Sequence, residues 1–270
     1  MKQSILVIAG SDSIAGAGAQ IDIKVAAALG VHATCALTAV TAQSTMSVDA
    51  IQLVEPEVVR AQIRAVFSDL PPAAIKIGML GGDAVAQAVA EELCEHPEVP
   101  VVLDPVLVAT SGGSLSADLM LDTLRGQLLP LCTVATPNLP EAEALSGMEI
   151  ARQEDIRPAA EAILSMGAAY VLVKGGHDAG EECVDELYEA DGAGAHKLLE
   201  LSSPRRPGEF HGTGCSLSTA IACGLAQGLG LEDAVTRAHD LVARMVASPT
   251  GFGHGSQIIS PFAEGDLAKG

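Results

Sequence analysis

The stretch SILVIAGSDSIAGAGAQIDIKVAAALG, residues 4–30, joins two patterns that together indicate the fold. Residues 4–10 form a short apolar run with β-branched members, which is typical of a buried strand. Residues 16–30 then favour a small-residue helix that ends at Gly30. A strand that passes through a glycine-rich turn directly into a helix is the repeating unit of α/β proteins.

The same alternation continues along the chain. Further strands are predicted at 74–78, 99–105, 133–138 and 168–176, and helices at 56–70, 83–93, 116–130, 154–167, 213–226 and 231–247. Residues 184–204 instead predict a hairpin that turns at Asp191-Gly192. Since no linker or internal repeat interrupts the pattern, we expect one domain, residues 1–270, of the α/β class with a mostly parallel sheet.

The composition excludes several classes of function. The net charge of −19 repels nucleic acid and anionic membranes, and aromatic residues make up only 2% of the chain. No apolar run reaches membrane-spanning length. The six cysteines form no CxxC pair and show no zinc spacing against the histidines. We therefore expect a cytoplasmic protein with reduced thiols, no nucleic-acid partner and no membrane partner.

A second glycine-rich turn, FHGTGCSLSTAIACG at 210–224, precedes the predicted helix 213–226. Gly212 and Gly214 allow a close backbone approach, and the free N–H groups of a helix start attract anions. An ordinary turn with a buried cysteine is the competing interpretation. The helix dipole is expected to lower the pKa of Cys215, which would suit a base or a nucleophile. Cys223 is expected to lie in the core.

Charged residues follow several predicted strands, where sites form in open α/β sheets. Asp104 ends a buried strand, and Asn138 and Glu141 follow the next one; such oxygens suit Mg²⁺. Lys174 precedes two glycines and is a candidate phosphate contact. Each of these residues also has a simpler interpretation: Asn138 as a helix cap, Glu141 as a surface carboxylate and Lys174 as an exposed lysine. Together with the anion site, this set suits phosphoryl transfer.

Asp22 lies within the first predicted helix among apolar neighbours. It is either a solvent-facing helix residue or a carboxylate that accepts a hydrogen bond from a small molecule. The turn before it, GAGAQI, lacks the third glycine of a dinucleotide-binding fingerprint. The chain also contains no GxxxxGK[ST] motif, so a kinase here would need another fold.

Seven motifs occur in an order that resembles one family. They are AGSDSIAGAGAQIDIK, ALTAVTAQST, KIGML, VVLDPVLVATSGG, TPNLPEAEALSG, VLVKGGH and HGTGCSLSTAIACGLAQG. The chain is similar, from residue 5 to about 228, to the hydroxymethylpyrimidine/phosphomethylpyrimidine kinases of thiamine biosynthesis, a branch of the ribokinase-like superfamily. The resemblance implies a three-layer α/β/α fold and two successive ATP-dependent phosphorylations, first of 4-amino-5-hydroxymethyl-2-methylpyrimidine and then of its monophosphate.

The resemblance also implies roles for individual residues. The pyrimidine would be bound by Gly10, Asp22, Gln43, Met79 and Val106, with a hydrogen bond from Gln43. Gly212 and Gly214 would form the anion hole, and Cys215 would take the position of the aspartate base of sugar kinases. ATP phosphates would meet Lys174 and Thr213, and Mg²⁺ would be supported by Asp104 and Glu141. A homodimer is implied as well.

Three alternatives stay open. Pyridoxal kinases share the fold, and the unusual Ile14, Ala15 and Phe210 leave the choice of substrate undecided. A non-catalytic metabolite-binding protein with this fold would need no base beside the anion site. A thiol enzyme with Cys215 as nucleophile would form a covalent adduct with its substrate.

Overall fold

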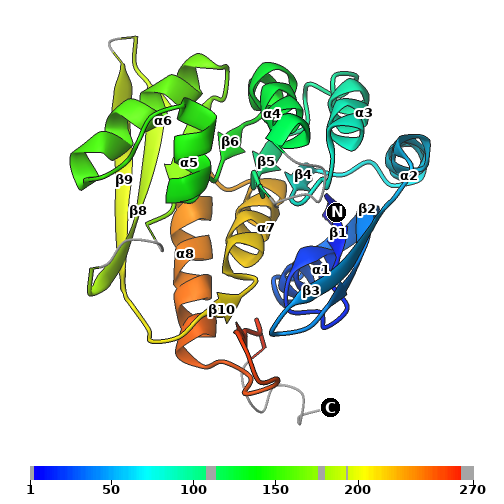
Figure 1. Ribbon diagram of the computed structural model, residues 1–270. Helices are drawn as coiled ribbons and strands as arrows, with labels where there is room; N and C mark the ends of the chain where they lie inside the picture. Colours follow the sequence, from blue (N-terminus) through cyan, green and yellow to red (C-terminus); the bar gives the residue numbers. More distant parts are fainter. Residues whose placement is uncertain (1–2, 108–113, 176–179, 193, 263–270) are drawn as a thin grey trace.

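A computed structural model describes residues 3–107, 114–175, 180–192 and 194–262 (Figure 1). Its main sheet has nine strands in the order β3-β2-β1-β4-β5-β6-β7-β8-β9. The strands are β1 (Ser4–Ser11), β2 (His32–Gln43), β3 (Val48–Leu53), β4 (Ala74–Ile77), β5 (Val101–Leu103), β6 (Val134–Ala135), β7 (Tyr170–Val173), β8 (Glu182–Ala190) and β9 (Ala195–Pro204). Short strands β10 (Phe210–His211) and β11 (Gln257–Ile258) pair separately.

The middle of the sheet is parallel and its edges are antiparallel. Strands β2, β1, β4, β5, β6 and β7 pair in parallel, whereas β3, β8 and β9 add antiparallel edges. The helices are α1 (Gly18–Ala28), α2 (Pro56–Asp69), α3 (Asp83–Leu93), α4 (Ser114–Thr123), α5 (Leu139–Ser146), α6 (Ile156–Ser165), α7 (Thr213–Ala226) and α8 (Leu231–Ala247). Helix α4 continues through a π turn, Leu124–Leu128, and a 3-10 turn, Leu129–Leu131.

Helices cover both faces of the sheet, so the fold has three layers (Figure 1). Successive residues of a strand point to opposite faces. On β1, Ile5 and Val7 belong to the core formed with α1, α7 and α8. Leu6 and Ile8 belong to the core on the other face, formed with helices α2, α3, α5 and α6. All four side chains are fully buried. This two-sided burial explains why β1 is a continuous apolar run without alternation.

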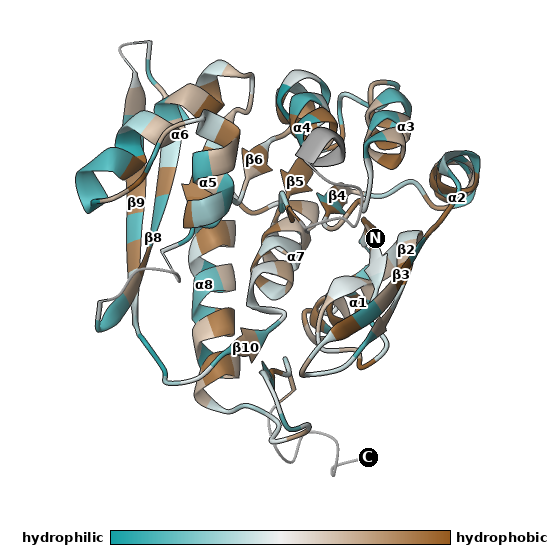
Figure 2. Cartoon of the chain, viewed as in Figure 1, coloured by the Kyte–Doolittle hydropathy of each residue, from teal (hydrophilic) through white to brown (hydrophobic). Residues whose placement is uncertain are grey.

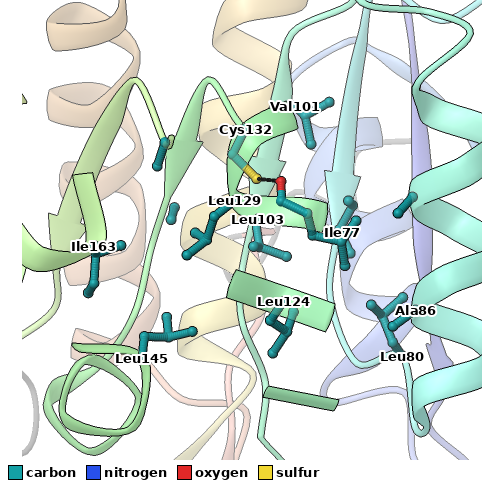
Figure 3. Packing of buried hydrophobic residues seen from close by; sticks show 14 of the residues in the cluster. Ile77, Leu80, Ala86, Val101, Leu103, Leu124, Leu129, Cys132, Leu145 and Ile163 are labelled. Atoms are coloured by element: carbon teal, nitrogen blue, oxygen red, sulfur yellow. Dashed lines mark hydrogen bonds between the residues drawn. The ribbon is translucent and has the colours of Figure 1, made fainter. Parts of the chain in front are cut away.

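The core that contains Leu6 and Ile8 consists mainly of aliphatic side chains (Figure 3). Leu103 from β5 and Ile77 from β4 meet Leu124 and Leu129 from the turns after α4, and all four are buried. The Cys132 thiol donates to the Leu128 carbonyl at 3.0 Å. In Figure 2 the short central strands β5 and β6 are brown, while the outer side of α6 is teal. The central strands therefore meet helices on both faces.

The predicted α/β class and the mostly parallel sheet are confirmed. The strands that begin near 4, 74, 101, 134 and 170 occur as predicted, as does the hairpin of β8 and β9. The sequence analysis missed β2, β3 and α5. Strand β3 is exposed along its whole length, so it lacks the apolar alternation of a half-buried strand. Helix α5 is short, and its signal is the Asn138–Glu141 capping box.

Replacement of Leu103 by Ala tests the two-sided burial of the central strands. Leu103 is 0% exposed, so the change should lower the free energy of unfolding by about 2–5 kcal/mol. Leu119→Ala is the matched control because Leu119 on α4 is 48% exposed, and it should change stability by less than about 0.5 kcal/mol. Urea unfolding measures both values; equal effects would contradict the packing described here.

Candidate active site

Two glycine-rich loops touch where α7 begins. A Cβ atom on Gly212 would collide with the Gly16 carbonyl oxygen, and one on Gly18 would collide with the Gly10 carbonyl oxygen. Gly212 and Gly18 also have positive φ angles of 87° and 57°. Glycine is therefore required at both positions. These contacts bring the turn after β1 against the turn before α7.

The first turn of α7 is suited to an anion. Gly212 is its N-cap, and the turn carries no acidic side chain and no capping side chain. The first amides of any helix lack intrahelical acceptors, and the dipole adds partial positive charge there. Thr213 and Gly214 therefore present amides where the sequence analysis placed the anion hole.

A buried charge cluster lies beside Gly214. Lys174 Nζ donates to Asp104 Oδ1 at 2.7 Å, and Glu141 Oε2 is 4.0 Å from the same nitrogen. A Cβ on Gly214 would lie 3.1 Å from Lys174 Nζ and 3.3 Å from Asp104 Oδ2. The parallel bridge between Asn138 and Lys174 aligns the segments that supply these side chains. The structure thus brings four of the predicted site residues together.

The electrostatics of this cluster follow from burial. Burial alone would lower the pKa of Lys174, but Asp104 and Glu141 outweigh it and raise that pKa. Burial raises the pKa of Glu141 to about 7; Lys174 opposes this change and Asp104 adds to it. Glu141 also completes the capping box of α5 with Asn138. It is a buried carboxyl, so the surface-carboxylate alternative is wrong.

The same carboxylates test the expected Mg²⁺ site. No group of three acidic, histidine or cysteine ligands stands ready for a metal within the described ranges. Mg²⁺ commonly uses only one or two carboxylates together with waters and substrate phosphates. Asp104 contributes to the raised pKa of Glu141, and added positive charge would relieve the repulsion between the two carboxylates. The donor set therefore fits Mg²⁺ that arrives with a nucleotide.

A cavity of ≈ 480 Å³ opens from the anion end of α7. Lys174, Thr213 and Gly214 line one part of it, and apolar side chains of α7 and α8 line another. The apolar group consists of Leu217, Val242, Ala243 and Val246. Small-molecule sites combine apolar walls with a few polar groups in this way. The volume and lining suit a nucleotide whose phosphates reach the α7 amides.

Cys215 lies in the same first turn and is half-buried. Burial raises the pKa of its thiol to about 11, although the Lys76 ammonium opposes that rise. The expected lowering of this pKa is therefore wrong in direction, because desolvation outweighs the Lys76 ammonium and the Gly18 amide, which both lower it. Cys215 is a thiol at neutral pH in this structure. Cys223, two turns further along α7, is fully buried, as expected for a core residue.

Asp22 is buried more deeply than expected from the sequence, which suggested a solvent-facing residue or a contact to a small molecule. Its side chain is 0% exposed, which rules out a solvent-facing residue. Lys76 Nζ donates to Oδ2 at 2.7 Å, and Thr219 Oγ1 donates to Oδ1 at 2.7 Å. Both oxygens are thus engaged by protein groups beneath the site.

The residues expected to bind the pyrimidine lie at the carboxyl ends of neighbouring strands. Gly10 at the end of β1 is covered by the Met79 side chain, which a Cβ would displace. Gln43 ends β2 and lies 2.9 Å, Nε2 to Nε2, from His211. Val106 lies two residues after Asp104, next to the end of a described range at 107. None of these four residues lines the cavity beside α7.

The sequence analysis missed three partners of the site: Lys76, Asp12 and His211. Asp12 accepts hydrogen bonds from the amides of Ile14, Gly16 and Ala17, and its Oδ2 is 3.1 Å from His211 Nε2. Burial alone would raise the pKa of Asp12, but His211 and these amides outweigh it and lower that pKa. The signal for Lys76 was a lone lysine inside a buried strand pattern.

None of the helices within the described ranges is long and apolar enough to cross a membrane.

Curated proteins with known functions are similar to this chain over most of its length. The curated hydroxymethylpyrimidine/phosphomethylpyrimidine kinase of Streptomyces coelicolor is 43% identical over 253 residues, which covers 93% of this chain and 92% of that protein. A bifunctional thiamine biosynthesis protein of Geobacter sulfurreducens is 43% identical over 255 residues, and this chain spans about half of its length (51%).

Solved structures give the same fold. A Staphylococcus aureus pyridoxal kinase in complex with AMP-PCP and pyridoxal has a TM-score of 0.88, is 30% identical, and aligns over 99% of this chain and 96% of its own. A Clostridium difficile phosphomethylpyrimidine kinase has a TM-score of 0.76, is 35% identical, and aligns over 90% and 99%. The ribokinase-like fold expected from the sequence is confirmed.

The family assignment rests on the extent of these matches. The family model described as phosphomethylpyrimidine kinase matches residues 12–260, which include both glycine-rich loops, the Lys174 cluster and Cys215. The chain belongs to the phosphomethylpyrimidine kinase family.

Proposed function

We propose that this chain transfers the γ-phosphoryl group of ATP to 4-amino-5-hydroxymethyl-2-methylpyrimidine and then to the resulting monophosphate, in thiamine biosynthesis. The observation that carries the proposal is the arrangement around Gly214: helix amides, Lys174 and two carboxylates meet at one end of the ≈ 480 Å³ cavity. Phosphoryl transfer depends on positioning and charge stabilisation of this kind. The identity with curated relatives supports the substrate.

We propose that the nucleotide and the pyrimidine approach the first turn of α7 from opposite sides. The cavity side supplies Lys174 and Thr213 for the phosphates and apolar α7 and α8 side chains for the rest of the nucleotide. The other side supplies Gly10, Gln43, Met79 and Val106 for the pyrimidine ring. The amides at Gly212 and Gly214 would then hold the phosphoryl group as it moves between them.

In this mechanism Cys215 acts in its thiolate form, whose sulfur accepts the proton of the substrate hydroxyl and becomes the thiol. As the hydroxyl oxygen bonds to the γ-phosphorus, the bond from that phosphorus to the β–γ bridging oxygen breaks and ADP leaves. Asp104 and Glu141 would hold Mg²⁺, which neutralises phosphate charge when bound. Because the pKa of the thiol is about 11, only a small fraction is thiolate at neutral pH.

The remaining parts of the proposal concern the protein as a whole. One sheet runs through the described chain and the family model spans 12–260, which supports a single kinase domain over 1–270. All six cysteines are unpaired, which supports a cytoplasmic enzyme. Exposed apolar side chains on β2 and β3, namely Val40, Val48, Ile51 and Leu53, support a homodimer through that edge.

The choice between pyrimidine and pyridoxal is tested by product analysis. The purified protein is incubated with ATP and Mg²⁺ and with hydroxymethylpyrimidine, its monophosphate or pyridoxal, and products are identified by mass spectrometry. We expect the diphosphate from the pyrimidine monophosphate, because a pyridoxal kinase has no reason to make the second transfer. Pyridoxal phosphate as the sole product would favour the second candidate function, pyridoxal kinase. The high TM-scores of pyridoxal kinases support that candidate. No product would favour a non-catalytic protein.

The role of Cys215 is tested by Cys215→Ala. Loss of the proton acceptor should lower kcat by at least about a hundredfold and change the Kd for ATP by less than about threefold. In the wild type, kcat should rise about tenfold per pH unit below pH 9, because the thiolate fraction grows as pH approaches the pKa of about 11. Cys223→Ala removes a thiol from the buried side of α7 and serves as the control. Unchanged kcat in Cys215→Ala would remove the cysteine from the mechanism.

A search for a covalent adduct during turnover distinguishes a Cys215 base from a Cys215 nucleophile. A nucleophilic Cys215 predicts a covalent adduct with substrate that survives denaturation and is seen by intact-protein mass spectrometry. We expect no such adduct during turnover.

The homodimer is tested by light scattering coupled to size-exclusion chromatography. The chain of 27.4 kDa should elute with about twice that mass. Ile51→Lys places a charge on the exposed apolar edge and should shift the protein toward the monomer, whereas Leu119→Lys on the distant α4 should not. A wild-type monomer would contradict the proposal.

A further inference from the structure

Lys76 and Asp22 form an ion pair that stability alone does not explain. Both side chains are 0% exposed, and Nζ lies 2.7 Å from Oδ2. The desolvation of two charges opposes such a pair, and well-packed apolar residues of similar volume often stabilise a protein as well or better. The pair also belongs to no step of the mechanism above. Its place in the fold indicates what it does.

The pair lies directly under the turn that carries Cys215. Thr219, which donates to Asp22 at 2.7 Å, is four residues after Cys215 on α7, so the two side chains share one face of that helix. Gly78 leaves room for the ammonium: a Cβ there would lie 2.7 Å from Lys76 Nζ. The lysine therefore ends at the carboxyl edge of the sheet, beneath the first turn of α7.

Four charged groups interact electrostatically with Cys215. They are Asp22 from α1, Lys76 from β4, Asp104 after β5 and Lys174 after β7. The Gly18 amide also donates toward the sulfur. Both lysines are paired with an aspartate, but Lys76 is the cation that lowers the pKa of the Cys215 thiol. Burial alone would lower the pKa of Lys76, but Asp22, Cys215 and Asp104 outweigh it and raise that pKa, so the lysine is charged.

We propose that Lys76 is a positioning residue that stabilises the anionic form of the Cys215 sulfur, and that Asp22 both holds Lys76 in place and limits its effect. This rests on the proposed function, in which Cys215 acts through its sulfur. Lys76 reaches no substrate, because its side chain is fully buried. The Coulomb interaction between an ammonium and a thiolate in a buried site is large enough to change how often the thiolate forms.

The proposal predicts opposite effects for the two members of the pair. Lys76→Met removes the cation and should slow alkylation of Cys215 by iodoacetamide at pH 8 by about tenfold, which corresponds to one pKa unit. Asp22→Asn keeps an oxygen for Lys76 but removes the opposing charge, so it should accelerate the same reaction. Peptide-resolved mass spectrometry reads each cysteine separately, and the exposed Cys94 in the same sample is the internal control.

The direction of the two changes distinguishes the proposal from a purely structural role. A structural pair would loosen the site in both variants and change the alkylation rate in the same direction, and this result would overturn the proposal, as would unchanged rates. Lys76→Met leaves a buried carboxylate without its partner. Should it fail to fold, the pH dependence of alkylation in Asp22→Asn decides: loss of the opposing charge should move the profile to lower pH, whereas loosening of the site would raise the rate at every pH without that shift. Alkylation needs no substrate, so its outcome is independent of the product analysis that tests the proposed function.

Discussion

Everything in the site depends on how the first turn of α7 is held. Two buried Lys–Asp pairs support it: Lys174 and Asp104 lie against Gly214, and Lys76 and Asp22 are joined to α7 through Thr219. Gly212, at the start of the same helix, packs against the backbone of the loop after β1. Removal of one charge from either pair would leave the other buried and unpaired, which is costly. The helix start is therefore fixed in position before any ligand arrives.

A net charge of −19 is compatible with the nucleotide binding that we propose. The positive potential comes from backbone amides, the helix dipole and a buried lysine rather than from a basic surface. The acidic surface and the anion site do not conflict, because the site draws on groups within the fold. Burial, with a smaller contribution from Asp104, raises the pKa of Glu141 to about 7, and a bound cation would oppose that rise.

Most of the secondary structure and several of the site residues could be predicted from the sequence. The residues that could not be predicted are those whose partners lie far away in the chain. The buried strands were clear because both faces of β1 and β5 are apolar, and the glycine loops were clear because Gly212 and Gly18 need positive φ. The role of Asp22 was not predictable, since its partners Lys76 and Thr219 are 54 and 197 residues away. Burial of Cys215 by those elements also reversed the effect that its helix position suggested. Local pattern gives the elements, whereas the energy of a buried charge depends on distant neighbours.

Nucleotide binding to Gly214→Ala tests most directly whether the first turn of α7 holds the phosphates. The added Cβ would lie 3.1 Å from Lys174 Nζ and 3.3 Å from Asp104 Oδ2, so it narrows the anion site without a change of charge. Gly230→Ala, where a Cβ meets nothing within 4 Å, is the control. Calorimetric titration with a non-hydrolysable ATP analogue and Mg²⁺ should show affinity at least about tenfold weaker for Gly214→Ala and unchanged for Gly230→Ala. Equal affinity in Gly214→Ala and the wild type would contradict the account.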